Sequence, residues 1–241
     1  FVSSKILNDQ NIKIVNDEVV DISVDKASLL SLTLDSGMVI CVKSAIVCAG
    51  TFLPGKIHVG KQTYSAGRFA EPPSKGITES LISLGFESCR LKTGTPPRLL
   101  SDSVNWGVLD LAMGDEKINY FSIKTDDSFQ APNIPCYIAK TNSKTHQILK
   151  KHLYQSPMYS GKINAIGPRY CPSVEDKVVR FADKDSHQLF LEPEWENSKQ
   201  IYVNGFSTSM PEDVQIESLR SIKGLENVEL IRPGYAIEYD F

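Results

Sequence analysis

The pattern of hydrophobic and polar positions predicts β-structure near the start of the chain. Residues 12–14 and 19–22 alternate as two short strands around an Asn-Asp turn. Residues 30–34 and 38–42 flank Asp35-Ser36-Gly37, a sequence typical of a hairpin turn. Together these segments predict an antiparallel meander.

The apolar run at residues 45–50 predicts a buried strand that ends at a glycine. A meander that leads into such a strand is typical of α/β nucleotide-binding proteins, although many other sheets share it. Helical periodicity and turn residues predict further elements along the chain. Helices are expected at residues 74–84, 146–153, 174–181 and 214–222, and strands at 86–91, 188–191, 201–203, 228–232 and 235–239.

Residues 99–145 interrupt this regular pattern with aspartates, prolines and little periodicity. We therefore expect a looser inserted subdomain at residues 99–168, between two parts of one larger domain at residues 1–98 and 169–241. The chain begins with Phe1 rather than Met, and we expect it to be a piece of a longer protein.

Composition restricts the classes of protein that fit. The chain has 241 residues, of which 41% are hydrophobic and 23% charged, as is usual for a globular protein. The net charge is −3, so any contact with RNA has to be local. No apolar run reaches the roughly 18 residues that a membrane span needs, and no membrane partner is expected.

Cysteine and histidine usage predicts no metal site. The five cysteines are odd in number and form no C-x-x-C pair, which argues for a reducing compartment and against a thiolate zinc site. None of the four histidines has a ligand spacing; His146 and His152 lie six positions apart, on different faces of a helix. Glu192 and Glu194 alternate around Pro193, which predicts a solvated strand edge rather than a catalytic carboxylate pair.

Residues 50–56 have the glycines and the lysine of a phosphate-binding P-loop. Two features argue against a nucleoside triphosphatase. Ile57 replaces the hydroxyl that would hold magnesium, and Pro54 has no N–H to direct at a phosphate. We expect a turn after the buried strand.

Ser74 follows Pro72-Pro73 and is a candidate helix N-cap. The free N–H groups at such a helix start would also suit a phosphate or a flavin carbonyl. From the residues alone both interpretations stay open.

The densest segment lies at residues 167–181. Ser173 and Asp176 have the spacing of a capping box, so a helix is expected to begin at Val174. Cys171 then stands just before the helix, near Arg169, where the helix dipole and the guanidinium both favour the nucleophilic thiolate. The same helix start could receive a dinucleotide pyrophosphate, and the alternative for Cys171 is a buried structural cysteine.

At this point several motifs resemble the glucose-inhibited division protein A family, over nearly the whole chain. They are A-G-T-F-L at 49–53, G-R at 67–68, E-P-P-S at 71–74, R-L-K-T-G-T-P-P-R at 90–98, S-P-M-Y at 156–159, the run 167–181, F-L-E-P-E at 190–194, S-T-S at 207–209 and R-P-G-Y-A-I-E-Y-D at 232–240. This family is the flavoprotein subunit of the enzyme that installs carboxymethylaminomethyl on the wobble uridine of certain tRNAs.

The resemblance implies an α/β fold, part of a glutathione-reductase-type FAD-binding fold with an inserted α/β subdomain. It implies that NADH reduces FAD, and that the reduced flavin handles a folate-derived one-carbon unit that is joined to the uridine. It also implies a homodimer that works with a GTPase partner on tRNA, in the cytoplasm or, for a eukaryotic source, in the mitochondrial matrix.

The resemblance also implies roles for single residues. Val19 and Ser74 match flavin contacts, and Cys171, with Arg169 beside it, matches a cysteine important for the chemistry. The segment that matches the NAD site consists of Gly167, Pro168, Arg169, Tyr170, Cys171, Pro172, Ser173, Val174, Glu175, Asp176, Lys177, Val178, Val179, Arg180 and Phe181.

The chain departs from the family pattern in its flavin loops. Ala49 stands where the family has Thr, and Phe69 and Ala70 stand where it has small residues. The G-x-G-x-x-G fingerprint of the FAD pyrophosphate is absent from the sequence. We therefore expect this piece alone to bind FAD weakly and to be inactive.

Three functions stay open at this stage. The first is wobble-uridine modification, with Cys171 as a thiolate that adds to uracil C6 or as a proton donor. The second is the related folate- and FAD-dependent tRNA uridine methyltransferase. The third is a non-catalytic RNA-binding module, which would be colourless and indifferent to NADH.

Overall fold

The computed structural model describes residues 2–25, 30–116, 119–126, 128–130, 133–167 and 172–241. The chain divides into two compact units. The first unit holds residues 1–55, 65–89 and 239–241, and the second holds residues 56–64 and 90–238. The boundaries expected at residues 98 and 168 concern the family's domains and stay a prediction.

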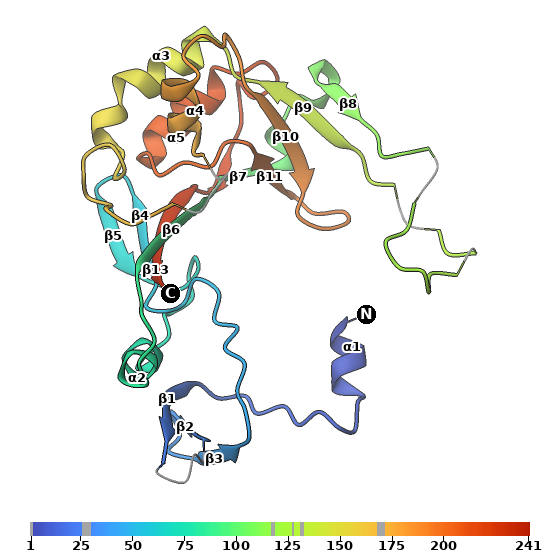
Figure 1. Ribbon diagram of the computed structural model, residues 1–241. Coiled ribbons are helices and arrows are strands. Elements are labelled where there is room, and N and C mark those ends of the chain that lie inside the picture. Colours follow the sequence, from blue (N-terminus) through green and yellow to red (C-terminus); the bar gives the residue numbers. More distant parts are fainter. Residues whose placement is uncertain (1, 26–29, 117–118, 127, 131–132, 168–171) are drawn as a thin grey trace. The chain divides into compact units, whose positions relative to one another are not determined.

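The first unit is built on a small antiparallel sheet with the order β1-β2-β3 (Figure 1). Its elements are α1 (Val2–Leu7), β1 (Val19–Val24), β2 (Leu30–Leu34), β3 (Val39–Val42) and α2 (Ile77–Ser83). The predicted hairpin is confirmed. Gly37 has a φ of +85°, a conformation that glycine adopts without strain, and its N–H donates to the Leu34 carbonyl at 2.8 Å.

Two strand predictions in the first unit are wrong, and a third begins too early. In the segment predicted as a strand at residues 86–91, the observed strand begins only at Arg90. Residues 12–14 form no strand, and neither does the apolar run at residues 45–50. Ile46 is 90% exposed. A strand needs a neighbour for its N–H and C=O groups, and among the described residues this run has none. The apolar composition of residues 45–50 therefore does not place this run in a sheet.

The second unit contains two sheets (Figure 1). Their strands run in the orders β12-β7-β11-β10-β9-β8 and β5-β4-β13-β6. The strands are β4 (Lys56–Val59), β5 (Gln62–Ser65), β6 (Arg90–Thr95), β7 (Arg98–Leu100), β8 (Asp110–Ala112), β9 (Cys136–Lys140), β10 (Gln188–Pro193), β11 (Gln200–Asn204), β12 (Leu230–Arg232) and β13 (Tyr235–Asp240).

Three helices lie next to one another on one side of the larger sheet (Figure 1). They are α3 (Ser143–Lys151), α4 (Val174–Arg180) and α5 (Glu212–Arg220), and short 3-10 turns cover Ser101–Ser103, Trp106–Val108 and Leu153–Gln155. The helices expected near residues 146, 174 and 214 are thus confirmed, as are the strands expected after residue 188. The α/β class expected from the sequence is also confirmed.

The second unit has a large apolar core between these helices and the six-stranded sheet. Leu99, Leu149, Leu191, Phe206 and Leu219 all have no solvent exposure there. The core of the first unit is much smaller and centres on Ile22, Leu53 and Ile77. Within the described residues, no helix has the length and apolar character that a membrane crossing requires.

Candidate functional site

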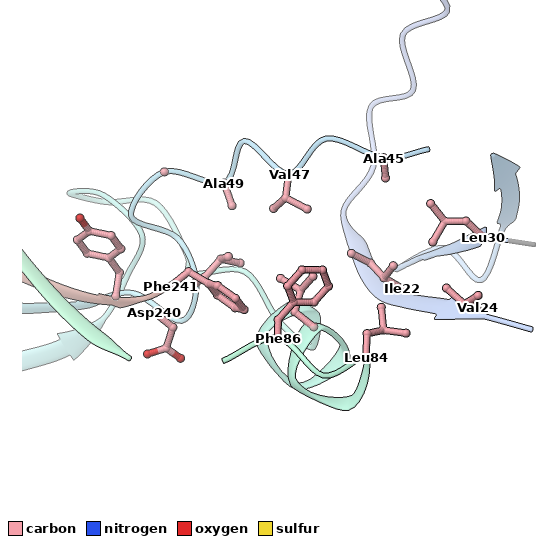
Figure 2. A pocket seen from close by; sticks show the side chains of 14 residues that line it. Ile22, Val24, Leu30, Ala45, Val47, Ala49, Leu84, Phe86, Asp240 and Phe241 are labelled. Carbon is pink, nitrogen blue, oxygen red and sulfur yellow. The ribbon is translucent and has the colours of Figure 1, made fainter. Parts of the chain in front are cut away.

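The first unit contains a mostly apolar cavity of about 770 Å³. Figure 2 shows Val47 from the 45–50 segment and Leu84 and Phe86 from the end of α2 directed into the same space. Asp240 brings a carboxylate to the lining. A concave apolar space of this size, with few polar groups, suits a planar ring system.

A second cavity of about 680 Å³ lies in the same unit and shares Ile22, Ala45 and Val47 with the first. Val19 and Ser74 both line it, although 55 positions separate them in the sequence. The structure therefore brings together the two residues for which the family resemblance implies flavin contacts.

Two carboxylates, Asp17 and Glu18, line the second cavity as well. A hydrogen bond from Ser36 is the main cause that holds the pKa of Asp17 below its usual range. Glu18 accepts a hydrogen bond from the N–H of Lys75 at 3.0 Å. Ionised carboxylates accept hydrogen bonds from ribose hydroxyls in dinucleotide sites, so this rim offers acceptors of the right kind.

The 50–56 segment forms a turn, as expected. The N–H groups of Phe52 and Gly55 donate to Ala49 and Phe52 carbonyls, so they are not directed at a ligand. Glycine is required at two places beside the turn. A Cβ on Gly67 would lie 2.0 Å from the Phe52 ring, and one on Gly55 would lie 2.2 Å from the Ala66 carbonyl.

Ser74 is not the N-cap of α2. The cap is Gly76, with a φ of +75°, and a Cβ there would lie 2.0 Å from the Val20 carbonyl oxygen. The close approach of β1 excludes any side chain at this position. Ser74 instead donates its N–H to the Phe52 carbonyl at 2.9 Å, and its half-buried side chain lines the second cavity.

The capping box predicted for the 167–181 segment is confirmed. The Ser173 hydroxyl accepts from the Asp176 N–H at 3.2 Å, the Asp176 carboxylate accepts from the Ser173 N–H, and α4 begins at Val174. Gly167 follows Ile166, which pairs with β6 through Arg90 and Lys92. Pro168, Arg169, Tyr170 and Cys171 lie outside the described residues.

The side chains of the NAD-assigned segment divide into two groups. Buried residues face the interior, and the others are exposed to solvent. The buried group is Ser173, Val174, Glu175, Asp176 and Val178, and the exposed group is Val179, Arg180 and Phe181, with Pro172 and Lys177 in between.

Glu175 is fully buried and joins α4 to the loop before α5. Its Oε1 accepts from the Thr208 hydroxyl at 2.8 Å and from the Ser209 N–H at 3.1 Å. Its Oε2 has no partner among the described residues. Burial raises the pKa of the Glu175 carboxyl above its usual range. Its side chain links α4 to the loop at residues 208–209.

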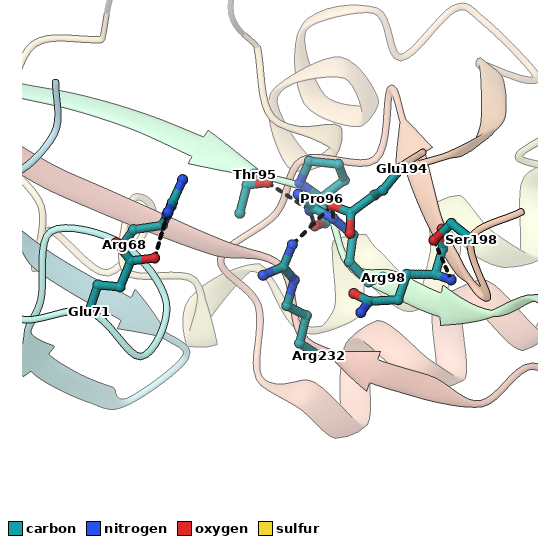
Figure 3. A network of polar contacts seen from close by, with 9 residues as sticks. Arg68, Glu71, Thr95, Pro96, Arg98, Glu194, Ser198 and Arg232 are labelled. Carbon is teal, nitrogen blue, oxygen red and sulfur yellow. Dashed lines mark hydrogen bonds and ion pairs between the residues drawn. The ribbon is translucent and has the colours of Figure 1, made fainter. Parts of the chain in front are cut away.

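A network of two arginines and one carboxylate was missed from the sequence (Figure 3). Arg98 donates through Nε to Glu194 and through Nη1 to the Thr95 hydroxyl, and Arg232 donates to the same Glu194 oxygen at 3.0 Å. The Arg98 guanidinium also lies 4.3 Å from the centre of the Tyr202 ring.

This network corrects the interpretation of Glu192 and Glu194 as a solvated edge. β10 pairs with β9 on one side and β11 on the other, so it is an inner strand. The Glu194 side chain is only 15% exposed because both arginines cover it. Arg98 and Arg232 lie opposite each other on the adjacent strands β7 and β12, and the distance between them in the sequence hides this pairing.

In the described part of the chain, no group of three or more metal-binding side chains comes together. The histidines have other partners. His58 shares a hydrogen bond of 2.6 Å with Glu238 and one of 3.2 Å with Thr63, and His146 contacts the Thr141 hydroxyl at 2.8 Å.

A family model described as glucose inhibited division protein A matches residues 1–241. Two curated relatives carry the name tRNA uridine 5-carboxymethylaminomethyl modification enzyme MnmG. The protein of Chlorobium phaeobacteroides is 51% identical over 239 residues, and that of Chlorobaculum tepidum is 50% identical over 235 residues. These matches cover 98% and 97% of this chain, and the chain spans 38% of each relative.

Solved structures of Aquifex aeolicus GidA have the same fold. The form I crystal matches with a TM-score of 0.88 and 44% identity, over 98% of this chain and 40% of the other. The form II crystal matches with a TM-score of 0.87 and 41% identity, over 98% and 38%.

Proposed function

The chain belongs to the glucose-inhibited division protein A family, and on that premise we propose that it is part of a flavin-dependent enzyme that modifies the wobble uridine of tRNA. The reaction installs carboxymethylaminomethyl at C5 of the uracil ring. The printed names of the curated relatives support this activity. The observation on this chain that carries the proposal is the cavity that Val19 and Ser74 line together.

The cofactor of the proposal is FAD, and the residues present fit it. The second cavity offers the Val19 backbone and the half-buried Ser74 hydroxyl, and the adjoining cavity offers an apolar space next to it. FAD reduced by NADH would supply electrons and help to handle a one-carbon unit derived from folate. The segment at residues 167–181 is proposed to contact NADH through the groups that α4 leaves exposed.

The uracil step is assigned to Cys171. C5 of uracil is a poor carbon nucleophile, and a thiolate that bonds to C6 pushes an electron pair toward O4 and makes C5 nucleophilic. C5 then bonds to the electrophilic methylene carbon. Loss of the C5 proton to a base and departure of the thiolate restore the ring. Arg169 is proposed to stabilise the negative charge.

The proposal includes the assembly in which the protein works. The partners are tRNA as substrate, a GTPase subunit and a second copy of the same protein, and the place is the cytoplasm. The relatives' bacterial sources and names support the substrate and the place.

An absorbance spectrum of the intact cellular protein tests the flavin. We expect a yellow protein whose absorbance near 450 nm is bleached by NADH, as is general for reducible flavins. A Ser74→Tyr variant should lose bound FAD because the ring fills the second cavity. Ser3→Tyr on exposed α1 is the control and should keep it. A colourless protein would favour a non-catalytic module.

Nucleoside analysis tests the reaction. A strain without the gene should lose carboxymethylaminomethyl at the wobble position, and Cys171→Ser should fail to restore it while FAD stays bound. Loss of a methyl group at another uridine instead would favour the related methyltransferase. Normal modification in the Cys171→Ser strain would exclude the nucleophile.

A further inference from the structure

Helix α3 separates a buried face from a basic exposed face. Thr145, His146, Ile148 and Leu149 are buried against the rest of the second unit, including α4 and α5. The exposed positions of the helix are Ser143, Lys144, Gln147, Lys150 and Lys151. At 100° per residue, these five positions fall within about 120° of the helix circumference. The solvent side therefore carries positive charge and no carboxylate.

The sequence around α3 is free of acids over a long stretch. Residues 128–174 contain five lysines and one arginine but no Asp or Glu, although the whole chain has 29 acids and a net charge of −3. Lys140 is exposed at the end of β9, two residues before the Asn142 N-cap of α3. In the described part of the chain, no carboxylate lies within 4.0 Å of the ammonium groups of residues 140, 144, 150 or 151. Their charge is therefore not neutralised by ion pairs.

An exposed aromatic ring follows the helix. Tyr154 is 70% exposed, and its ring lies over His152 with centroids 6.5 Å apart and an angle of 23° between the planes. Gln155 holds the pair through Nε2, which lies 3.0 Å from the Tyr154 hydroxyl and 2.9 Å from His152 Nδ1. The His152 ring thus lies on one side of the Tyr154 ring, and the rest of the Tyr154 ring is open to solvent.

We propose that this surface, formed by Lys140, Lys144, Lys150, Lys151 and Tyr154 and named the α3 surface, docks tRNA. The lysines would contact backbone phosphates, and the Tyr154 ring would stack on an unpaired base. The inference rests on the proposed function, because it needs tRNA as the substrate. It also explains how a chain with negative net charge holds RNA, since the contact is confined to the acid-free segment.

The test is tRNA binding by the intact cellular protein, with an unmodified tRNA transcript as the probe. The triple variant Lys144→Gln, Lys150→Gln and Lys151→Gln should bind roughly ten-fold more weakly. Because each lost phosphate contact removes about 0.9 from the slope of log K against log salt, the slope should fall by about two to three. Glutamine keeps the helix propensity of lysine, so α3 should stay folded.

The matched control is Lys43→Gln, Lys124→Gln and Lys199→Gln, which removes the same charge from three exposed positions in loops away from α3. It should leave affinity and salt slope unchanged. Tyr154→Ala should weaken binding without changing the salt slope, and Tyr154→Phe should restore it, because stacking depends on the ring and not on the hydroxyl.

The possible outcomes separate the two proposals. If the wild-type protein does not bind tRNA, the proposed function fails and this inference fails with it. If the wild type binds and the α3 triple variant binds as tightly with the same salt slope, RNA is not the occupant, while the proposed function stands. Equal losses in the α3 and control triple variants would also overturn the assignment, because they would show a general charge effect.

Discussion

The two units of the chain use apolar residues in different ways. The second unit encloses them: Phe206, Leu191 and Val203 are fully buried between its helices and its sheet. The first unit leaves Ile46 and Phe86 90% and 57% exposed and lines a cavity with its apolar groups. Burial stabilises a fold in proportion to the area removed from water. The second unit should therefore hold itself together, whereas the apolar groups of the first unit are available to a ligand.

The sharpest test of this comparison is a pair of phenylalanine truncations. Phe206→Ala should lower the free energy of unfolding of the second unit by about 3–5 kcal/mol, because it empties a fully buried site. Phe86→Ala should change it by less than about 0.5 kcal/mol. Urea unfolding followed by tryptophan fluorescence measures this, because both tryptophans, Trp106 and Trp195, lie in the second unit. A large effect of Phe86→Ala would contradict the independence of the two units.

The next effect concerns the buried carboxyl of the second unit. Glu175→Ala should cost about 1–3 kcal/mol, because the Thr208 hydroxyl and the Ser209 N–H lose their acceptor. Glu175→Gln should cost far less, since its amide oxygen can still accept both hydrogen bonds. Glu226→Gln is the control at an exposed glutamate. If Glu175→Gln were as harmful as Glu175→Ala, the carboxyl would have to act as an anion.

In the first unit a backbone effect should be visible without any packing effect. A Cβ on Gly37 would meet nothing within 4 Å, but the φ of +85° is unfavourable for alanine. Gly37→Ala should therefore cost about 1 kcal/mol, measured as faster hydrogen exchange of the β2 and β3 amides. Gly107→Ala in the second unit is the control, since its Cβ would meet only Asn105 Oδ1 at 3.7 Å. Unchanged exchange in the Gly37→Ala hairpin would show that the turn relaxes freely.

The smallest expected effect is a pH dependence confined to the second unit. Burial is the main cause that lowers the pKa values of His146 and His187 below their ordinary value of 6.5. Their contribution is fully present above pH 6.5 and is lost as the pH falls below it, because the unfolded chain takes up protons first. Urea unfolding between pH 7.5 and 5 should show this loss, and His146→Gln with His187→Gln should flatten it. The raised pKa of Glu175 acts in the opposite direction, so the comparison is between the wild type and the double variant. Parallel changes in the two proteins between pH 7.5 and 5 would contradict a contribution from the histidines.

Local sequence signals predicted local structure well. Asp35-Ser36-Gly37 specifies its hairpin because the turn needs a positive φ that Gly37 supplies. Ser173 and Asp176 specify the start of α4 because both partners of the capping box lie within four residues. Such features depend on neighbours in the sequence, so the sequence is enough to find them.

Features that depend on distant partners were missed. The 45–50 run was expected in a sheet because apolar composition does not say whether a neighbouring strand exists. Ser74 was one candidate cap for α2, but the approach of the Val20 carbonyl moves the helix start to Gly76. The His58–Glu238 bond and the Arg98–Glu194–Arg232 network join residues 180, 96 and 38 positions apart, which no local pattern encodes.

The pairing of β4 with β13 has a consequence for how the protein is made on the ribosome. Ile57 lies opposite Ile237 in that pair, so the smaller sheet of the second unit stays open until the residues of β13, about 180 positions later, have emerged. Until then, one edge of β4 in the nascent second unit lacks its hydrogen-bonding partner strand. Contacts between residues this far apart in the sequence form slowly. Shortened versions that stop before residue 236 would therefore expose that edge permanently and would be prone to associate with one another.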